Sequence, residues 1–139
     1  MQKDIDIIIY GATGFTGQLC VKYFQSLNTD VNWAIAGRDQ DKLQKVASDN
    51  SVDVEILIAD SDDEIALDIL TSRAKVILST TGPFHRYGSK LVASCVKNST
   101  NYVDITGENF WVKGLIAKHH EEASAKGIRI IPSCGYDSI

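Results

Sequence analysis

The sequence predicts an α/β domain: a doubly wound parallel sheet of about six strands with helices on both faces. Apolar, β-branched runs alternate with helical patterns along all 139 residues. Several of these runs, such as Val76-Ile77-Leu78, are apolar on both faces, as expected for strands buried between two helical layers. A glycine-rich turn separates the first strand from the first helix. Right-handed crossovers then favour the strand order 3-2-1-4-5-6.

Each predicted strand is a short aliphatic or β-branched run that ends at a glycine, a proline or polar residues. In order, we predict strands near residues 4–10 (DIDIIIY), 31–36 (VNWAIA), 53–59 (DVEILIA), 75–80 (KVILST), 101–105 (NYVDI) and 128–132 (IRIIP). Nothing in the order suggests a repeat or a long linker, so residues 1–139 are expected to form one domain.

The intervening segments have helical spacing. We predict helices near residues 15–28, 40–49, 62–71, 87–97 and 110–126. The first shows apolar residues at helical spacing, namely Leu19, Tyr23, Phe24 and Leu27. The acidic run at residues 60–64 marks a strand end followed by a helix start, where Ser and Asp cap free N–H groups, and a metal site is the less favoured interpretation.

Composition excludes several function classes. The net charge is −4 and no Lys/Arg cluster offsets it, which argues against broad nucleic-acid binding. No apolar run approaches the roughly 18–20 residues of a membrane helix, and the N-terminus leads directly into a strand, so we expect no signal peptide. The three cysteines are scattered and odd in number, which favours a reduced cytoplasmic setting and no zinc site.

Residues 7–17, IIIYGATGFTG, form a strand that turns through three glycines into a helix. Gly11 permits the tight turn, Gly14 lets the backbone approach phosphates, and Gly17 lets the helix pack against the strand. An anion then lies at the positive helix N-terminus. The motif in this context predicts a dinucleotide site, and the alternative is a purely structural turn.

The end of the second strand indicates which dinucleotide binds. NAD-selective sheets place Asp or Glu about 20 residues past the glycines, to hold the ribose 2′-hydroxyl. Here Gly37 occupies that position and Arg38 follows. A guanidinium binds a 2′-phosphate, so NADP(H) is predicted over NAD. Two alternatives stay open: Asp39 could reach the ribose, or Arg38 could be a solvated turn residue.

Three further segments follow predicted strands and therefore lie, like the end of the second strand, at the carboxyl edge of the sheet. Asp60 could accept from the adenine amino group or cap the next helix. Thr81, Gly82 and Pro83 follow the fourth strand, where hydroxyls and a Gly-Pro turn suit close approach to the pyrophosphate and nicotinamide ribose, although a plain β-turn would look similar. Glu108 is the best-placed carboxylate for substrate or ribose contact, and capping the following helix is its alternative role.

No catalytic residue can be identified. Tyr87 and Lys90 are three positions apart and follow the wrong strand for a short-chain dehydrogenase pair. No Gly-x-Ser-x-Gly elbow is present. The remaining candidates are expected to be structural: a loop histidine rather than a proton donor, two surface histidines and an inert thiol, namely His85, His119, His120 and Cys134.

Five blocks carry a resemblance to a known family. They are YGATGFTG (10–17), WAIAGR (33–38), TGPFHRYG (81–88), YVDITGE (102–108) and IPSCGYDS (131–138). With these blocks in order, the sequence resembles the N-terminal domain of saccharopine dehydrogenase-like oxidoreductases, which include trans-acting enoyl reductases. The resemblance implies a Rossmann domain that binds a nicotinamide dinucleotide, through Gly11, Thr13, Gly14, Phe15, Thr16, Gly17, Arg38, Asp60, Thr81, Gly82 and Pro83. It implies no catalytic residue.

The resemblance also implies a following substrate domain, entered shortly after residues 134–138. The last residues read as a strand and a loop, with no sequence left to build a substrate site, so we expect residues 1–139 to be the front part of a longer protein. The expected function is NADP-dependent hydride transfer to a small or lipid-like substrate. A non-catalytic redox sensor is the alternative. An exposed sheet edge favours self-association, so a homodimer is one candidate state.

Overall fold

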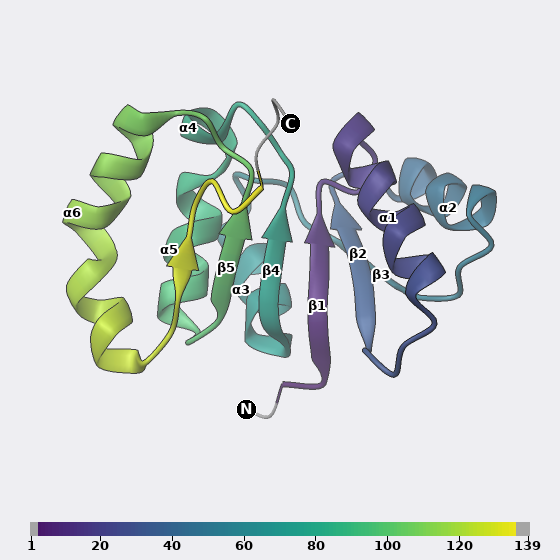
Figure 1. Ribbon diagram of the computed structural model, residues 1–139, viewed down its shortest axis with the longest axis horizontal. Helices are drawn as coiled ribbons and strands as arrows, with labels where there is room; N and C mark the ends of the chain where they lie inside the picture. Colours follow the sequence, from purple (N-terminus) through teal and green to yellow (C-terminus); the bar gives the residue numbers. More distant parts are fainter. Residues whose placement is uncertain (1–2, 136–139) are drawn as a thin grey trace.

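Six parallel strands form one sheet in the order β3-β2-β1-β4-β5-β6 (Figure 1). The computed structural model describes residues 3–135. The strands are β1 (Ile5–Tyr10), β2 (Trp33–Gly37), β3 (Glu55–Ile58), β4 (Ala74–Ser79), β5 (Asn101–Asp104) and β6 (Ile130–Ile131). The predicted fold class and strand order are confirmed. The predicted strands extended past the observed ones at most ends, and by three residues each at β3 and β6.

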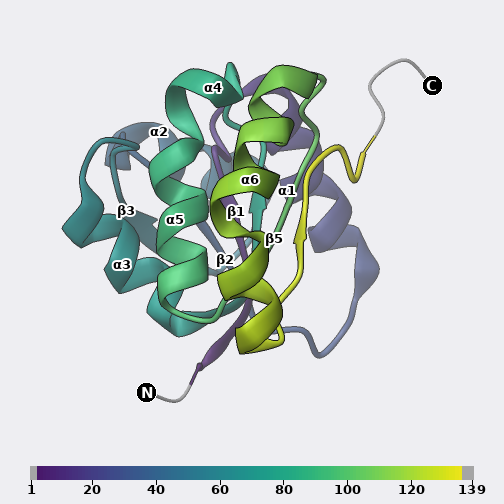
Figure 2. The same ribbon diagram turned by 90° about the vertical axis from the view of Figure 1, so that its left-hand side faces the viewer.

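Six helices connect the strands. They are α1 (Phe15–Leu27), α2 (Gln40–Asp49), α3 (Glu64–Arg73), α4 (Phe84–Tyr87), α5 (Ser89–Lys97) and α6 (Asn109–Lys126). One core layer joins α1 and α2 to the sheet through Ile9 and Ile35. The other joins α3, α5 and α6 to the sheet through Ile8, Ile77 and Tyr102. Figure 2 shows α5 and α6 on the side of the sheet opposite α1.

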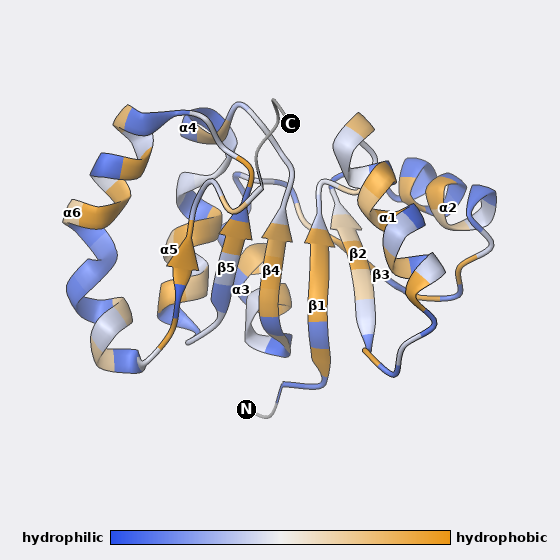
Figure 3. Ribbon diagram, viewed as in Figure 1, coloured by the Kyte–Doolittle hydropathy of each residue, from blue (hydrophilic) through white to orange (hydrophobic). Residues whose placement is uncertain are grey.

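Strand register shows that α1 and α2 cover only half of their face. Ile35, Ile9, Leu78, Val103 and Ile131 are successive register partners across β2, β1, β4, β5 and β6. Partners in register present their side chains to the same face. Ile9 and Ile35 are fully buried, Leu78 and Val103 only partly, and Ile131 is 43% exposed. An apolar row therefore continues beyond the helices, and Figure 3 shows the apolar colouring of β4 and β6 on this half.

The predicted helix at residues 87–97 divides into two at Gly88. A Cβ at Gly88 would lie 2.7 Å from the Trp111 ring, so only glycine fits between α4 and α6. The four-residue α4 precedes it and was not predicted. Its Phe84 is buried and packs on Trp111, with ring centroids 5.8 Å apart. A tertiary contact therefore determines where this segment is helical.

Of the four apolar residues that indicated α1, only Phe24 packs against the core. Leu19 is 50% and Tyr23 is 62% exposed. The buried residues are Gly17 and Val21, because Gly17 must face the glycine turn. Within residues 3–135, no helix is long and apolar enough to cross a membrane.

Candidate functional site

The glycine turn brings β1, α1 and the loop after β4 together without room for side chains. Gly11 has a φ of +89°, and its N–H donates to the carbonyl of Ala36 at 2.9 Å. A Cβ at Gly11 would lie 2.2 Å from Thr81 Oγ1. A Cβ at Gly17 would lie 2.1 Å from the Gly11 carbonyl oxygen. The predicted tight turn and the close packing of α1 on it are thus both present.

The N-terminus of α1 is open to an anion. Gly14 is its N-cap, no side chain caps the helix, and no acidic residue lies in the first turn. The first N–H groups of a helix lack intrahelical partners and carry partial positive charge. Thr13, Phe15 and Thr16 flank this end, and Phe15 is 83% exposed. A phosphate is the kind of group that such an uncapped helix start binds.

A crevice of about 230 Å³ lies beside the glycine turn, at the carboxyl edge of the sheet. Ligand pockets commonly measure about 300–1,000 Å³, so the crevice matches part of a dinucleotide rather than the whole. Of the predicted site residues, five line it, namely Gly11, Thr13, Arg38, Thr81 and Gly82. Tyr10, Gly37, Ser61 and Tyr87 complete the lining. Pro83 stands at the N-cap of α4.

At the end of β2, Arg38 lines this crevice, whereas the Asp39 carboxylate points to the start of α2. The Asp39 side chain accepts from the backbone N–H of Lys42 at 3.1 Å and so caps α2. Arg38 is exposed and, within the described part of the chain, makes no hydrogen bond or ion pair. Of the two residues that sequence reasoning left in competition, Asp39 is thus engaged in capping α2 and the Arg38 guanidinium is left free by the rest of the described chain.

Asp60 does not cap the following helix. Its carboxylate accepts from the N–H of Asp62 at 2.9 Å, and Asp63 caps α3 by accepting from Ala66 at 3.0 Å. The acidic run is thus a helix start, as predicted, but with a different capping residue. Ser61, not Asp60, lines the crevice. Tyr10 also lines the crevice, and burial together with the charge of Asp60 raises the pKa of its hydroxyl.

Thr81, which lines the crevice, carries a buried hydroxyl whose Oγ1 has no hydrogen-bond partner among residues 3–135. An unsatisfied buried hydroxyl costs about 1–3 kcal/mol, so such groups are rare without a ligand or water. The neighbouring Thr80 hydroxyl, by contrast, donates to the Gly11 carbonyl at 3.1 Å. The orphaned Thr81 hydroxyl, the free guanidinium and the uncapped α1 fit a phosphorylated dinucleotide.

Glu108 has a role that neither sequence interpretation included. It stands at the N-cap of α6 but its side chain does not cap that helix. Its carboxylate accepts from the N–H of Phe84 at 2.6 Å and of His85 at 3.2 Å, and it contacts the His85 imidazole. Burial acts to raise the pKa of Glu108, but these hydrogen bonds outweigh it and hold the pKa below its usual value. Glu108 therefore fixes α4, and His85 lies in that helix rather than in a loop.

Asp104 was missed by sequence reasoning. Its buried carboxylate accepts from the Tyr102 hydroxyl at 2.6 Å and from the N–H groups of Thr106 at 3.0 Å and Ser133 at 2.9 Å. It ties the end of β5 to the loop after β6. The exposed Cys134 lies in that loop, and its N–H donates to the Asp104 carbonyl at 2.8 Å. Residues 136–138 of the IPSCGYDS block lie outside the described residues.

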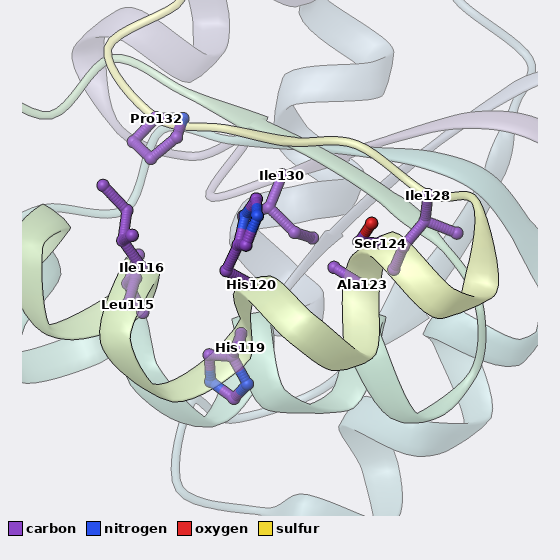
Figure 4. Close-up of a pocket in the computed structure, with 9 residues that line it drawn as sticks. All are labelled: Leu115, Ile116, His119, His120, Ala123, Ser124, Ile128, Ile130 and Pro132. Atoms are coloured by element: carbon purple, nitrogen blue, oxygen red, sulfur yellow. The ribbon is translucent and has the colours of Figure 1, made fainter.

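A second cavity, of about 260 Å³, lies between α6 and β6 (Figure 4). It is mainly apolar and lined by Leu115, Ile116, His119, His120, Ala123, Ser124, Ile128, Ile130 and Pro132. Figure 4 shows His119 and His120 pointing in different directions, as predicted. His119 is buried, however, which corrects its expected surface position, and burial lowers its pKa. No group of three metal-ligating side chains occurs among residues 3–135.

Comparisons with known proteins agree with this geometry. Residues 7–131 match the saccharopine dehydrogenase NADP binding domain family. The chain is 38% identical to a trans-acting enoyl reductase of Mycobacterium leprae and 39% identical to one of Mycobacterium ulcerans, over 99% of its length in both cases. It spans only about a third (34%) of the length of these curated relatives.

Solved structures show the same fold. The apo saccharopine dehydrogenase (L-Glu forming) of Saccharomyces cerevisiae matches 94% of the chain with a TM-score of 0.76 and 21% identity, over 27% of its own length. A short-chain dehydrogenase/reductase of Vibrio parahaemolyticus matches 91% of the chain with a TM-score of 0.67 and 16% identity, over 82% of its own length. With the family match covering most of the sequence, the chain belongs to the saccharopine dehydrogenase NADP-binding domain family.

Proposed function

We propose that the carboxyl edge of the sheet holds NADP(H), with the pyrophosphate at the N-terminus of α1 and the adenosine 2′-phosphate at Arg38. The observation that carries this assignment is the free guanidinium at the crevice, beside an Asp39 already engaged in capping α2. A guanidinium binds a phosphate through paired, charge-assisted hydrogen bonds. A carboxylate in its place would repel the 2′-phosphate and favour NAD.

The other predicted residues take supporting roles in this proposal. The Thr81 hydroxyl gains a partner from the bound dinucleotide, and Gly82 and Pro83 leave room for the ribose. Thr13, Phe15 and Thr16 surround the pyrophosphate at the start of α1, where Gly11, Gly14 and Gly17 supply the close approach. Asp60 lies next to Ser61 at the adenine side.

We further propose that the domain serves an oxidoreductase, in which a second domain supplies the substrate site. When bound, the nicotinamide supplies or accepts the hydride. The apolar row of Leu78, Val103 and Ile131, left uncovered by α1 and α2, supports a covering domain. The length of the curated relatives is consistent with one. Their name supports an enoyl, lipid-like substrate class, and the three free cysteines favour the reducing cytoplasm.

Paired titrations with NADPH and NADH test the cofactor assignment. Arg38→Ala is expected to weaken NADPH binding about 10- to 100-fold, the size of lost charge-assisted hydrogen bonds, and to change NADH binding little. Asp39→Asn is the matched control, because asparagine also caps helices and both affinities should stay the same. Equal weakening of NADPH and NADH by Arg38→Ala would overturn the role of Arg38.

A non-catalytic redox sensor is the second candidate function. It is favoured by the crevice lining, in which no histidine, lysine or carboxylate from residues 3–135 is present to move a proton. Absorbance at 340 nm separates the two candidates. The longer protein should oxidise NADPH when offered enoyl, imine or ketone compounds if it is an oxidoreductase. Tight NADPH binding without turnover on any of the three classes would favour the sensor.

A further inference from the structure

We infer that Tyr87 is an adenine-binding residue, whose ring forms one wall of the adenosine half of the crevice. Tyr87 lies in α4, and sequence reasoning assigned it no role, since its pairing with Lys90 was rejected. It lines the crevice together with Arg38 and Ser61, from the ends of β2 and β3. In a doubly wound sheet, the adenosine lies toward these strands. This inference rests on the proposed NADP(H) site.

The backbone of α4, which carries Tyr87, is held by three sets of contacts. At the start of α4, the Glu108 carboxylate accepts the N–H groups of Phe84 and His85. Phe84 is buried against the ring of Trp111. The Tyr87 N–H itself donates to the Pro83 carbonyl at 3.1 Å. Because the backbone that carries Tyr87 is already held in place, little backbone entropy is lost when a ligand binds, and this favours a binding role.

At the far end of the turn, Gly88 prevents α4 from moving inward. A Cβ there would lie 2.7 Å from the Trp111 ring and 2.8 Å from the Phe84 carbonyl oxygen, so the backbone is already at contact distance. With Phe84 directed into the core, Tyr87 is the α4 residue that reaches the crevice. The short helix α4 therefore holds the backbone of Tyr87 in a fixed place beside the crevice.

The chemistry of the lining leaves the adenine few other apolar surfaces. Glycine, threonine, serine and arginine make up most of it. The second aromatic residue, Tyr10, is 3% exposed and its hydroxyl is bound to the Ala59 carbonyl at 3.0 Å. Tyr87 is only partly buried. The guanidinium carbon of Arg86 lies 5.6 Å from its ring centroid, a cation–π contact that further restrains the ring. Aromatic rings bind bases by stacking, whatever hydrogen bonds are also present.

Displacement of bound NADPH, followed by nicotinamide fluorescence, tests the inference with two competitors. One is 2′,5′-ADP, which contains the base, and the other is inorganic pyrophosphate, which does not. Tyr87→Leu should weaken 2′,5′-ADP about tenfold, the size of an aromatic–base contact, and leave pyrophosphate unchanged. Tyr87→Phe should bind both as the wild type does. Tyr23→Leu, at an exposed tyrosine on α1, is the matched control and should change neither.

Each other result overturns the inference in a distinct way. Unchanged 2′,5′-ADP binding in Tyr87→Leu removes the ring from the site, while the NADP(H) assignment stands. Weakening by Tyr87→Phe assigns the contact to the hydroxyl instead, and equal weakening of both competitors indicates a deformed crevice. A wild type that binds neither NADPH nor 2′,5′-ADP overturns the proposed function as well.

If Tyr87→Leu does not fold, Tyr87→Trp gives an independent measurement. An indole ring also stacks on adenine, so 2′,5′-ADP affinity should be retained and the fluorescence of the new tryptophan should be quenched by 2′,5′-ADP but not by pyrophosphate. The wild type, with Trp33 and Trp111 alone, supplies the background. Absence of quenching at saturating 2′,5′-ADP would refute the contact.

Discussion

Replacing Gly17 with alanine is expected to destabilise the protein and to weaken its cofactor site together. The new Cβ would lie 2.1 Å from the Gly11 carbonyl oxygen and 2.7 Å from the Ala12 Cα. Both are backbone atoms that cannot rotate away, so α1 must shift outward. Overpacking of this kind costs about 1–3 kcal/mol. Replacing glycine by alanine inside a helix gains about 1 kcal/mol in helix propensity, which offsets part of that cost. We expect a net loss of up to about 2 kcal/mol.

Gly114→Ala is the matched control, because this glycine lies inside α6 and a Cβ added to it would meet nothing within 4 Å. Only the propensity gain applies, so the variant should be more stable than the wild type by about 0.5–1 kcal/mol. Urea denaturation gives both differences, and NADPH titration should show weakened binding in Gly17→Ala alone. A Gly17→Ala variant as stable as Gly114→Ala, with wild-type affinity, would refute the packing argument.

Three further outcomes follow from contacts outside the crevice. Asp104→Asn should lower the free energy of unfolding by about 1.5–3 kcal/mol, because it loses charge-assisted hydrogen bonds in a buried network, and an unchanged urea midpoint would contradict this. Hydrogen bonds from Arg73 hold the pKa of Glu55 in the folded protein below its usual value. The pair therefore stabilises the fold at pH values above about 4.3, the pKa of a glutamate in the unfolded chain. This contribution is lost as the pH falls through the lower pKa that Glu55 has in the folded protein. The wild-type advantage over Arg73→Met in urea midpoint should therefore shrink between pH 7 and pH 3, and a constant difference would argue against the pair. Iodoacetamide should alkylate the exposed Cys134 and spare Cys95, which is buried and has a raised pKa. Mass spectrometry of the alkylated native protein identifies the modified thiol, and alkylation of Cys95 ahead of Cys134 would contradict this prediction.

Sequence reasoning predicted the parts of the fold that depend on local pattern. The strand order follows from alternating elements and crossover handedness, and it is confirmed. The close packing at Gly17 follows from the spacing of the three glycines, and a Cβ there has no room. Both features follow from the order and spacing of residues along the chain, so one sequence suffices to recognise them.

The features that were missed depend on contacts between distant segments. The helix α4 has only four residues and exists because Glu108, 24 residues from Phe84, accepts its first N–H groups. The choice of Asp63 over Asp60 as the cap of α3 depends on where β3 ends. His119 is buried because α6 packs against α5, although its neighbour His120 is exposed. In each case the local sequence allows more than one answer, and tertiary packing selects among them.

Amide chemical-shift mapping tests most directly whether the carboxyl edge of the sheet is the dinucleotide site. Isotopically labelled protein would be titrated with NADP⁺ and the shifted backbone amides assigned. We predict that the largest shifts lie at residues 11–17, at Arg38 and at Thr81 and Gly82, with the cavity between α6 and β6 unaffected. Shifts concentrated at Leu115, Ile128 and Ile130, or no shifts at saturating NADP⁺, would contradict the account.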